Sequence, residues 1–161
     1  MYYILPDENK NLYKYLINKA DHFRSVFIAS VLSYFFVYGF EITHFTLSID
    51  EEFLNNFTHT VSLGRWGHAL LKKYLLPEPY IPFFSITFCL LTLSISATLS
   101  TYYLRLNRLL SYVFVIMMAA LPQMAYQIEF ENQVDTIAIS FLLSTLSNIV
   151  FEHRSRFRVV L

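Results

Sequence analysis

The sequence predicts an all-α, polytopic membrane protein with about four transmembrane helices and amphipathic helices beside the membrane. Three observations support this prediction: 55% of the 161 residues are apolar, only 15% are charged, and the mean hydropathy is +0.43. Soluble domains usually carry about 25% charged residues. Much of the apolar surface is therefore expected to face lipid, in a single membrane domain over residues 1–161.

Four apolar segments approach or reach the length that crosses a bilayer, which is about 20 mainly apolar residues. The predicted spans are residues 25–47, 81–104, 109–128 and 134–151. Glu41 and His44 interrupt the first near its end, which is tolerated close to the interface. The third contains Pro122, which is expected to kink it. The fourth is rich in Ser and Thr and suits packing against other helices.

The charges predict the orientation, because loops rich in Lys and Arg stay in the cytoplasm. Nine of the twelve basic residues precede the first span, separate the second from the third, or follow the fourth. Eight of the twelve acids lie on the other side, in the two remaining connections or at the span ends beside them. Both termini are therefore predicted to be cytoplasmic. Residues 1–24 are expected to form an amphipathic segment on the inner leaflet, with a flexible tail as the alternative. Residues 48–80 form the predicted outer loop.

Three consecutive carboxylates, Asp50, Glu51 and Glu52, follow the first span. Crowded carboxylates in a partly desolvated site raise the pKa of at least one of them, as a general base near neutral pH requires. Carboxylate oxygens can also hold a divalent cation. The residues alone leave a third interpretation open, in which the acids are a solvated, negatively charged flank.

An interfacial helix is predicted over residues 60–76 of the outer loop, with Trp66 at the level where indole prefers to lie. The only cations on that predicted side belong to this helix and are Arg65, Lys72 and Lys73. A lipid phosphate is their natural counter-ion. Ordinary contact with lipid headgroups is the alternative. Gly64 and Gly67 indicate a bend or a close backbone approach. A second acidic connection, ending at Asp135, lies on the same predicted side and either contributes to one polar site or forms a separate solvated loop.

Several function classes are disfavoured by the composition. The formal net charge is zero, so no excess of positive charge is present for binding nucleic acid. Cys89 is the only cysteine, and the histidines of the outer loop are too irregularly spaced to predict a zinc site. A transporter would need ionisable residues deep within several spans, and only Glu41 and His44 come close.

Several motifs together resemble the N-terminal part of the Gtr-type, serotype-converting O-antigen glucosyltransferases of bacteria and their phages. They are YGFEITH at 38–44, SIDEE at 48–52, SLGRWG at 62–67, PQ at 122–123, YQ at 126–127 and NQVD at 132–135. The acidic run followed by Gly-Arg-Trp after a first span is the most specific part. The resemblance covers residues 34–143.

The resemblance implies a GT-C-like enzyme of the bacterial cytoplasmic (inner) membrane. Such an enzyme takes glucose from a polyprenyl-phosphate carrier and transfers it to O-antigen on the outer side. Asp50 or Glu51 would then act as the catalytic base or help to bind a cation, and the cations of the outer loop would neutralise the carrier phosphate. The implied partners are a flippase and a glycosyltransferase that loads the carrier.

Enzymes of this type have about twice as many spans or more, so the chain is expected to be a truncated member, either active or inactive. A different hypothesis is a small non-catalytic four-helix accessory or scaffold protein of the membrane. The two differ in whether Asp50 or Glu51 is indispensable.

Overall fold

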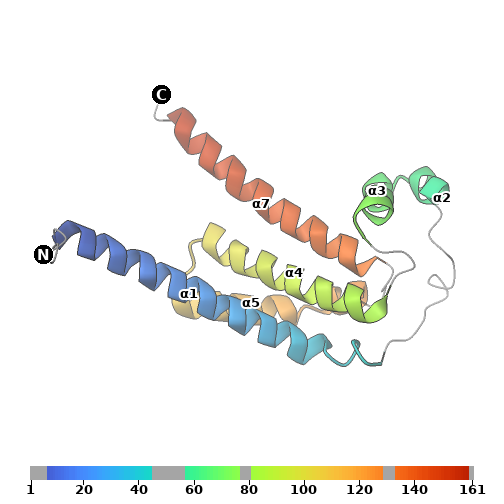
Figure 1. Cartoon of the computed structure of the whole chain (residues 1–161), viewed down its shortest axis with the longest axis horizontal. Coiled ribbons are helices and arrows are strands. Elements are labelled where there is room, and N and C mark those ends of the chain that lie inside the picture. The colour runs from blue at the N-terminus through green and yellow to red at the C-terminus, as the bar shows by residue number, and fades with distance from the viewer. Residues whose placement is uncertain (1–6, 45–56, 77–80, 129–132, 160–161) are drawn as a thin grey trace, which may run out of the picture.

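The computed structural model describes residues 7–44, 57–76, 81–128 and 133–159. Within these ranges every regular element is an α-helix, as Figure 1 shows. In chain order the helices are α1 (Asp7–Tyr38), α2 (Phe57–Ser62), α3 (Trp66–Tyr74), α4 (Pro82–Tyr103), α5 (Arg108–Ala119), α6 (Pro122–Ile128) and α7 (Val134–Val159).

The long helices form a bundle around α4, which contacts α1, α5 and α7. Its buried core combines large apolar side chains, such as Tyr34, Ile86 and Leu90, with small residues such as Ala97 and Ala138. Small residues let helix backbones approach closely, which favours helix association in membranes. Two buried hydroxyls on α4 are satisfied within the helix: Ser94 donates to the carbonyl of Leu90 at 2.7 Å and Thr98 donates to the carbonyl of Ser94 at 2.8 Å.

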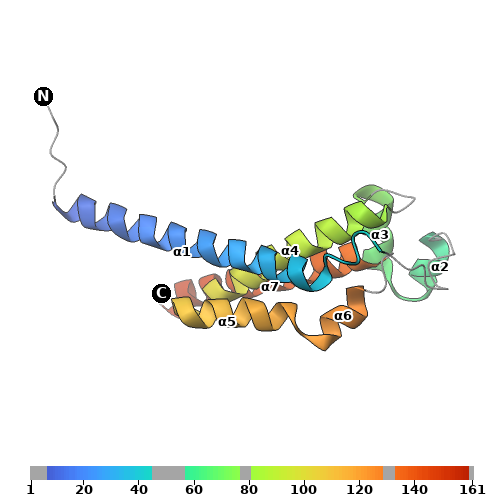
Figure 2. The ribbon, with the colours of Figure 1, turned by 90° about the horizontal axis from the view of Figure 1, so that it is seen from below.

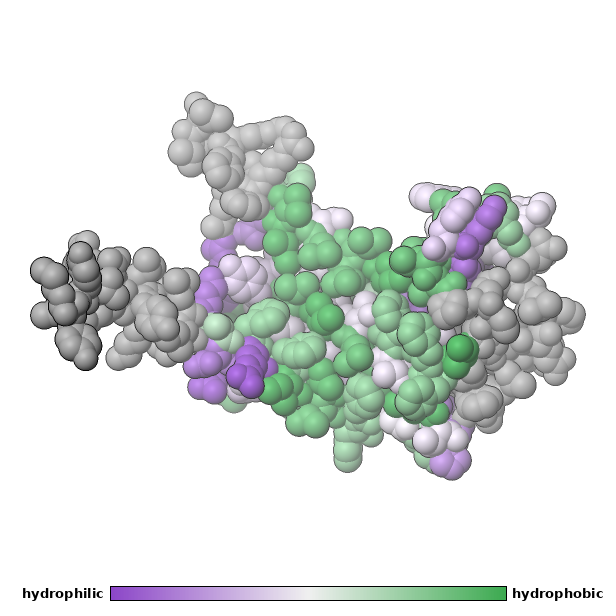
Figure 3. All heavy atoms as spheres, viewed as in Figure 1, coloured by the Kyte–Doolittle hydropathy of each residue, from purple (hydrophilic) through white to green (hydrophobic). Residues whose placement is uncertain are grey.

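The outside of the bundle is apolar. Figure 3 shows a broad hydrophobic band over its middle, with hydrophilic residues gathered toward its two ends. Phe36 is 92% exposed and Phe151 is 76% exposed, a costly arrangement in water. Among the described residues, two helical stretches are long and apolar enough to cross a membrane, Phe83–Tyr103 and Val134–Glu152. The bent pair of α5 and α6 gives a third if it is counted as one span. The predicted class, an all-α membrane protein, is confirmed; the count of four spans stays a prediction.

The third predicted span is divided where its proline predicts a kink. Helices α5 and α6 meet at an angle of 47°, and Figure 2 shows the bend between them. Pro122 is the first residue of α6, a position where its missing N–H and fixed φ are acceptable. The proline thus ends one helix and starts the next.

The first and fourth predicted spans have different limits from the helices observed at those positions. Helix α1 runs without a break from Asp7 to Tyr38, so the predicted inner-leaflet segment and the first span share one helix. That helix ends before the predicted limit at residue 47, and turns continue through residue 43. Helix α7 extends beyond the predicted limit at residue 151, to Val159. Amphipathic and apolar stretches propagate as one helix where no proline or glycine stops them.

The short helices α2 and α3 lie at one end of the bundle, and the start of α1 and the end of α7 lie toward the other (Figure 1). Helix α3 contacts the N-terminal part of α7. The motif at residues 62–67 and residues 133–135 of the second motif are therefore brought to the same end of the molecule.

Candidate functional site

Helices α2 and α3 are joined by a tight turn at residues 63–65. Gly64 has φ +78°, in the left-handed region that glycine adopts without steric cost. The N–H of Gly64 donates to the carbonyl of Val61 at 2.9 Å, and that of Arg65 donates to the carbonyl of Thr60 at 3.1 Å. The predicted bend is thus located at Gly64, and α2 folds back on α3.

A buried ion pair fixes α3 to α7. Lys72 Nζ lies 2.8 Å from Asp135 Oδ2, and the two residues are 4% and 0% exposed. The other carboxylate oxygen, Oδ1, accepts the N–H of Thr136 at 2.7 Å. Asp135 also lies in the first turn of α7, where the positive end of the helix dipole favours an anion. Both oxygens of the buried carboxylate are therefore compensated.

A second contact between the two helices determines the state of His68. Its Nδ1 lies 2.9 Å from Thr136 Oγ1, and the Thr136 hydroxyl donates its single hydrogen to the carbonyl of Gln133 at 2.8 Å. Nδ1 must therefore be the donor to Thr136. Burial lowers the pKa of His68, and Lys72 lowers it further. Asp135 opposes this effect and Arg65 adds to it. His68 is accordingly a neutral imidazole with its proton on Nδ1.

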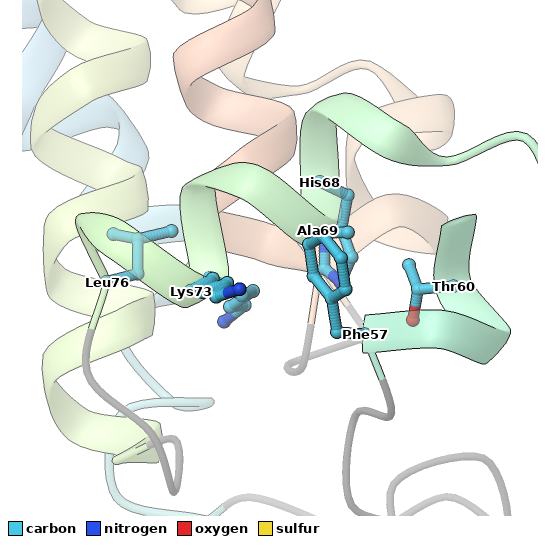
Figure 4. A pocket seen from close by; sticks show the side chains of 7 residues that line it. Phe57, Thr60, His68, Ala69, Lys73 and Leu76 are labelled. Atoms are coloured by element: carbon cyan, nitrogen blue, oxygen red, sulfur yellow. The ribbon is translucent and has the colours of Figure 1, made fainter.

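A pocket of about 380 Å³ opens between α2 and α3. It is lined by Phe57, Thr60, His68, Ala69, Lys72, Lys73 and Leu76, most of which are labelled in Figure 4. The ammonium of Lys73 lies 4.6 Å from the centroid of the Phe57 ring, a cation–π contact that ties the two helices together. The pocket combines an aromatic wall with a hydroxyl, an imidazole and an exposed ammonium.

This end of the molecule also falls within a recognised protein family. The family model described as "Glucosyl transferase GtrII" matches residues 39–161, which include the pocket, the ion pair and the motifs around them. The chain belongs to the GtrII glucosyl transferase family. No curated protein and no solved structure gives a significant match to this GtrII-family chain.

The structure places five of the eight predicted site residues of the GtrII-family protein. Lys72 and Asp135 form the ion pair and Lys73 lines the pocket, whereas Arg65 and Trp66 begin α3 with exposed side chains. The other three lie outside the described residues, so their catalytic, substrate-binding and cation-binding roles stay predictions: Asp50, Glu51 and Glu52.

Five of the seven residues that line the pocket were not predicted as substrate-binding: Phe57, Thr60, His68, Ala69 and Leu76. For His68 a signal was present, because it stands four residues before Lys72 and so shares one helix face with it. Within the described ranges, no group of three or more His, Cys, Asp or Glu side chains is arranged to hold a metal ion.

The lowered pKa of His68 predicts a loss of stability in acid. The unfolded chain binds a proton near the ordinary histidine pKa of about 6.5, whereas the folded chain binds it only at lower pH. Stability is therefore full above that value and falls as the pH drops below it. Thermal unfolding in detergent, followed between about pH 8 and about pH 5, should show this decline. The His68→Asn variant should show a shallower decline, and equal slopes would contradict the assignment.

Proposed function

We propose that this GtrII-family protein transfers glucose from a polyprenyl-phosphate carrier to O-antigen on the outer side of the bacterial cytoplasmic membrane. The family match carries the proposal, since it covers residues 39–161 and indicates a glucosyl transferase. The apolar surface of the bundle supports a substrate that is itself anchored in lipid. A flippase and a carrier-loading glycosyltransferase would supply that donor.

The position of α3 suggests how the carrier would be held. Trp66, Leu70 and Tyr74 are exposed along it, and such residues favour the membrane interface. Arg65 and Lys73 are its exposed cations, whereas the charge of Lys72 is balanced by Asp135. We therefore assign the carrier phosphate to Arg65 and Lys73, which would stabilise the negative charge that develops as the phosphate leaves.

The transfer itself needs a base and a leaving group. An acceptor hydroxyl attacks the anomeric carbon of glucose, the bond from that carbon to the phosphate oxygen breaks, and a carboxylate takes the hydroxyl proton. Asp50 or Glu51 is the proposed base. Both stand on the same predicted side of the membrane as α3.

The Lys73→Gln variant should raise the KM for the lipid-linked donor by about 10-fold or more, because a hydrogen bond to a charged group contributes about 1.5–3 kcal/mol. Lys19→Gln removes a similar charge from α1, where the ammonium bonds to Tyr102 in the last turn of α4, and serves as the matched control. Initial rates of glucose transfer at varied donor concentration measure the effect. A donor KM that changes equally in both variants would refute the assignment of Lys73.

The proposed function is tested with radiolabelled polyprenyl-phosphate-glucose, O-antigen and membranes that contain or lack this chain. Label that appears in O-antigen only when the chain is present supports the transferase. No transfer by well-folded protein would contradict it.

Failure of transfer would favour the alternative, a non-catalytic accessory protein that binds partners in the membrane. One observation favours that alternative: the candidate span of α7 is mostly exposed and carries polar residues such as Ser140, Ser144 and Asn148 on its surface. Polar side chains in a span suit contact with another helix.

A further inference from the structure

One residue that lines the pocket between α2 and α3 carries a hydrogen-bond acceptor that the described part of the chain leaves unused. His68 lines the pocket, and its Nδ1–H is committed to Thr136. In that tautomer the other ring nitrogen, Nε2, carries a lone pair and no hydrogen. No described residue forms a hydrogen bond to Nε2 in the structure. The acceptor is available to a ligand that donates a hydrogen bond, such as a hydroxyl group.

The other walls of the pocket supply complementary groups. Phe57, Ala69 and Leu76 form apolar surface, and Thr60 contributes a hydroxyl that can donate or accept. Lys73 contributes an ammonium, a donor only. Figure 4 shows these side chains coming from α2 on one side and from α3 and the turn after it on the other.

The charges of the pocket favour a neutral ligand over an isolated phosphate. Lys72 lines the pocket, but its charge is balanced by Asp135 at 2.8 Å, so Lys73 supplies the one net positive charge. A phosphate binds best where several donors converge and would face the lone pair of Nε2. A polyol can donate to Nε2, accept from Lys73 and Thr60, and place its apolar ring face against an aromatic wall.

We propose that this pocket binds a hexose unit of a substrate saccharide, and that His68 Nε2 accepts a hydrogen bond from one of its hydroxyl groups. The cavity of about 380 Å³ lies in the size range of small-molecule sites. This inference rests on the proposed function and deepens it, because it adds a specificity-determining residue that is separate from the carboxylates of the outer loop.

Two amide variants at position 68 separate the pocket role of His68 from its packing role. Asn places an N–H near the position of Nδ1, so His68→Asn keeps a donor for Thr136 and removes the acceptor from the pocket. Gln extends its amide to the position of Nε2, so His68→Gln keeps an acceptor in the pocket and removes the bond to Thr136. A purely structural role predicts damage in the Gln variant and none in the Asn variant.

Binding is measured by saturation-transfer NMR on the full chain in lipid nanodiscs, with maltotriose as the saccharide probe and inorganic phosphate as the anion probe. We expect the parent and His68→Gln to bind maltotriose, and His68→Asn to bind it about 10-fold more weakly, the effect of one lost hydrogen bond. Equal binding by all three proteins, no binding of maltotriose by the parent, or displacement of maltotriose by phosphate would each overturn the proposal. Phosphate that binds through Lys73 and leaves maltotriose in place would support both assignments, because the donor hexose is itself attached to the carrier phosphate.

The binding assay is independent of turnover, so the two proposals can fail separately. Saccharide binding without glucose transfer would leave the pocket intact and refute the transferase. Transfer by a protein that binds no saccharide, or that is unaffected by His68→Asn, would refute the pocket. Where both hold, a higher KM of His68→Asn for the lipid-linked donor identifies the donor glucose as the occupant, and a higher KM for O-antigen identifies the acceptor.

Discussion

Replacing Lys72 with methionine should lower the free energy of unfolding by about 3–5 kcal/mol, the usual cost of removing one partner from a buried ion pair. Asp135 would keep its charge in a site where it is 0% exposed, with the N–H of Thr136 and the dipole of α7 but no counter-ion to compensate it. Because this pair joins α3 to α7, the variant should also release α3 from the bundle. Denaturant unfolding in detergent, with the emission of Trp66 as the reporter on α3, measures both effects.

Two controls isolate the ion pair from the loss of a lysine. Lys73→Met removes the neighbouring, exposed ammonium, whose contact with Phe57 should contribute only about 0.5–1 kcal/mol. The double variant Lys72→Met with Asp135→Leu removes both charges and should recover most of the lost stability, since well-packed apolar residues can replace a buried pair. If Lys72→Met destabilises no more than Lys73→Met, the ion pair does not hold α3.

The positions of the long helices could be predicted from the sequence because the physical signals are local. An apolar run without charges gives α4 within a residue of its predicted ends, and Pro122 locates the break between α5 and α6. Gly64 likewise indicates the turn between α2 and α3, since its φ of +78° is one that glycine adopts freely. Each of these features depends on residues that are neighbours in the chain.

The pairing of Lys72 with Asp135 could not be predicted, because the two residues are 63 positions apart. A lysine on an amphipathic helix is satisfied equally by water, a lipid phosphate or a carboxylate, and spacing does not distinguish them. His68, Lys72 and Lys73 all fall within the one interfacial helix predicted over residues 60–76, and they lie on one polar side of it. The structure divides that side: His68 and Lys72 contact α7, and Lys73 stays exposed beside Phe57.

This division explains why the pocket was not predicted from the sequence. Phe57 and Thr60 carry no chemical signal by themselves, and they meet His68 only because the turn at Gly64 folds α2 back on α3. The tautomer of His68 depends on Thr136, which belongs to a different helix. A site formed by contacts between segments that are distant in the sequence can be recognised only in the folded chain.

Loss of the catalytic base should have the largest effect on activity. If Asp50 or Glu51 takes the proton of the acceptor hydroxyl, the variant that neutralises it, Asp50→Asn or Glu51→Gln, should lower kcat for glucose transfer by about 10²–10⁴-fold. Both substitutions preserve the size of the side chain, so the KM for the donor should change little. Initial rates with labelled polyprenyl-phosphate-glucose, measured for each single variant and for the double variant, identify the base.

The control for this prediction is Glu78→Gln, which removes one charge from the same outer segment at a position with no proposed role in the reaction. It should keep the parental kcat, and all variants should keep the parental unfolding midpoint. If the kcat of one single variant recovers at higher pH, another group is taking the proton in that variant. The substituted residue would then assist the base without being the base itself. Parental rates in both single variants and in the double variant would place the base elsewhere in the chain, and His68, which lines the pocket and keeps an unprotonated Nε2, would be the next residue to test.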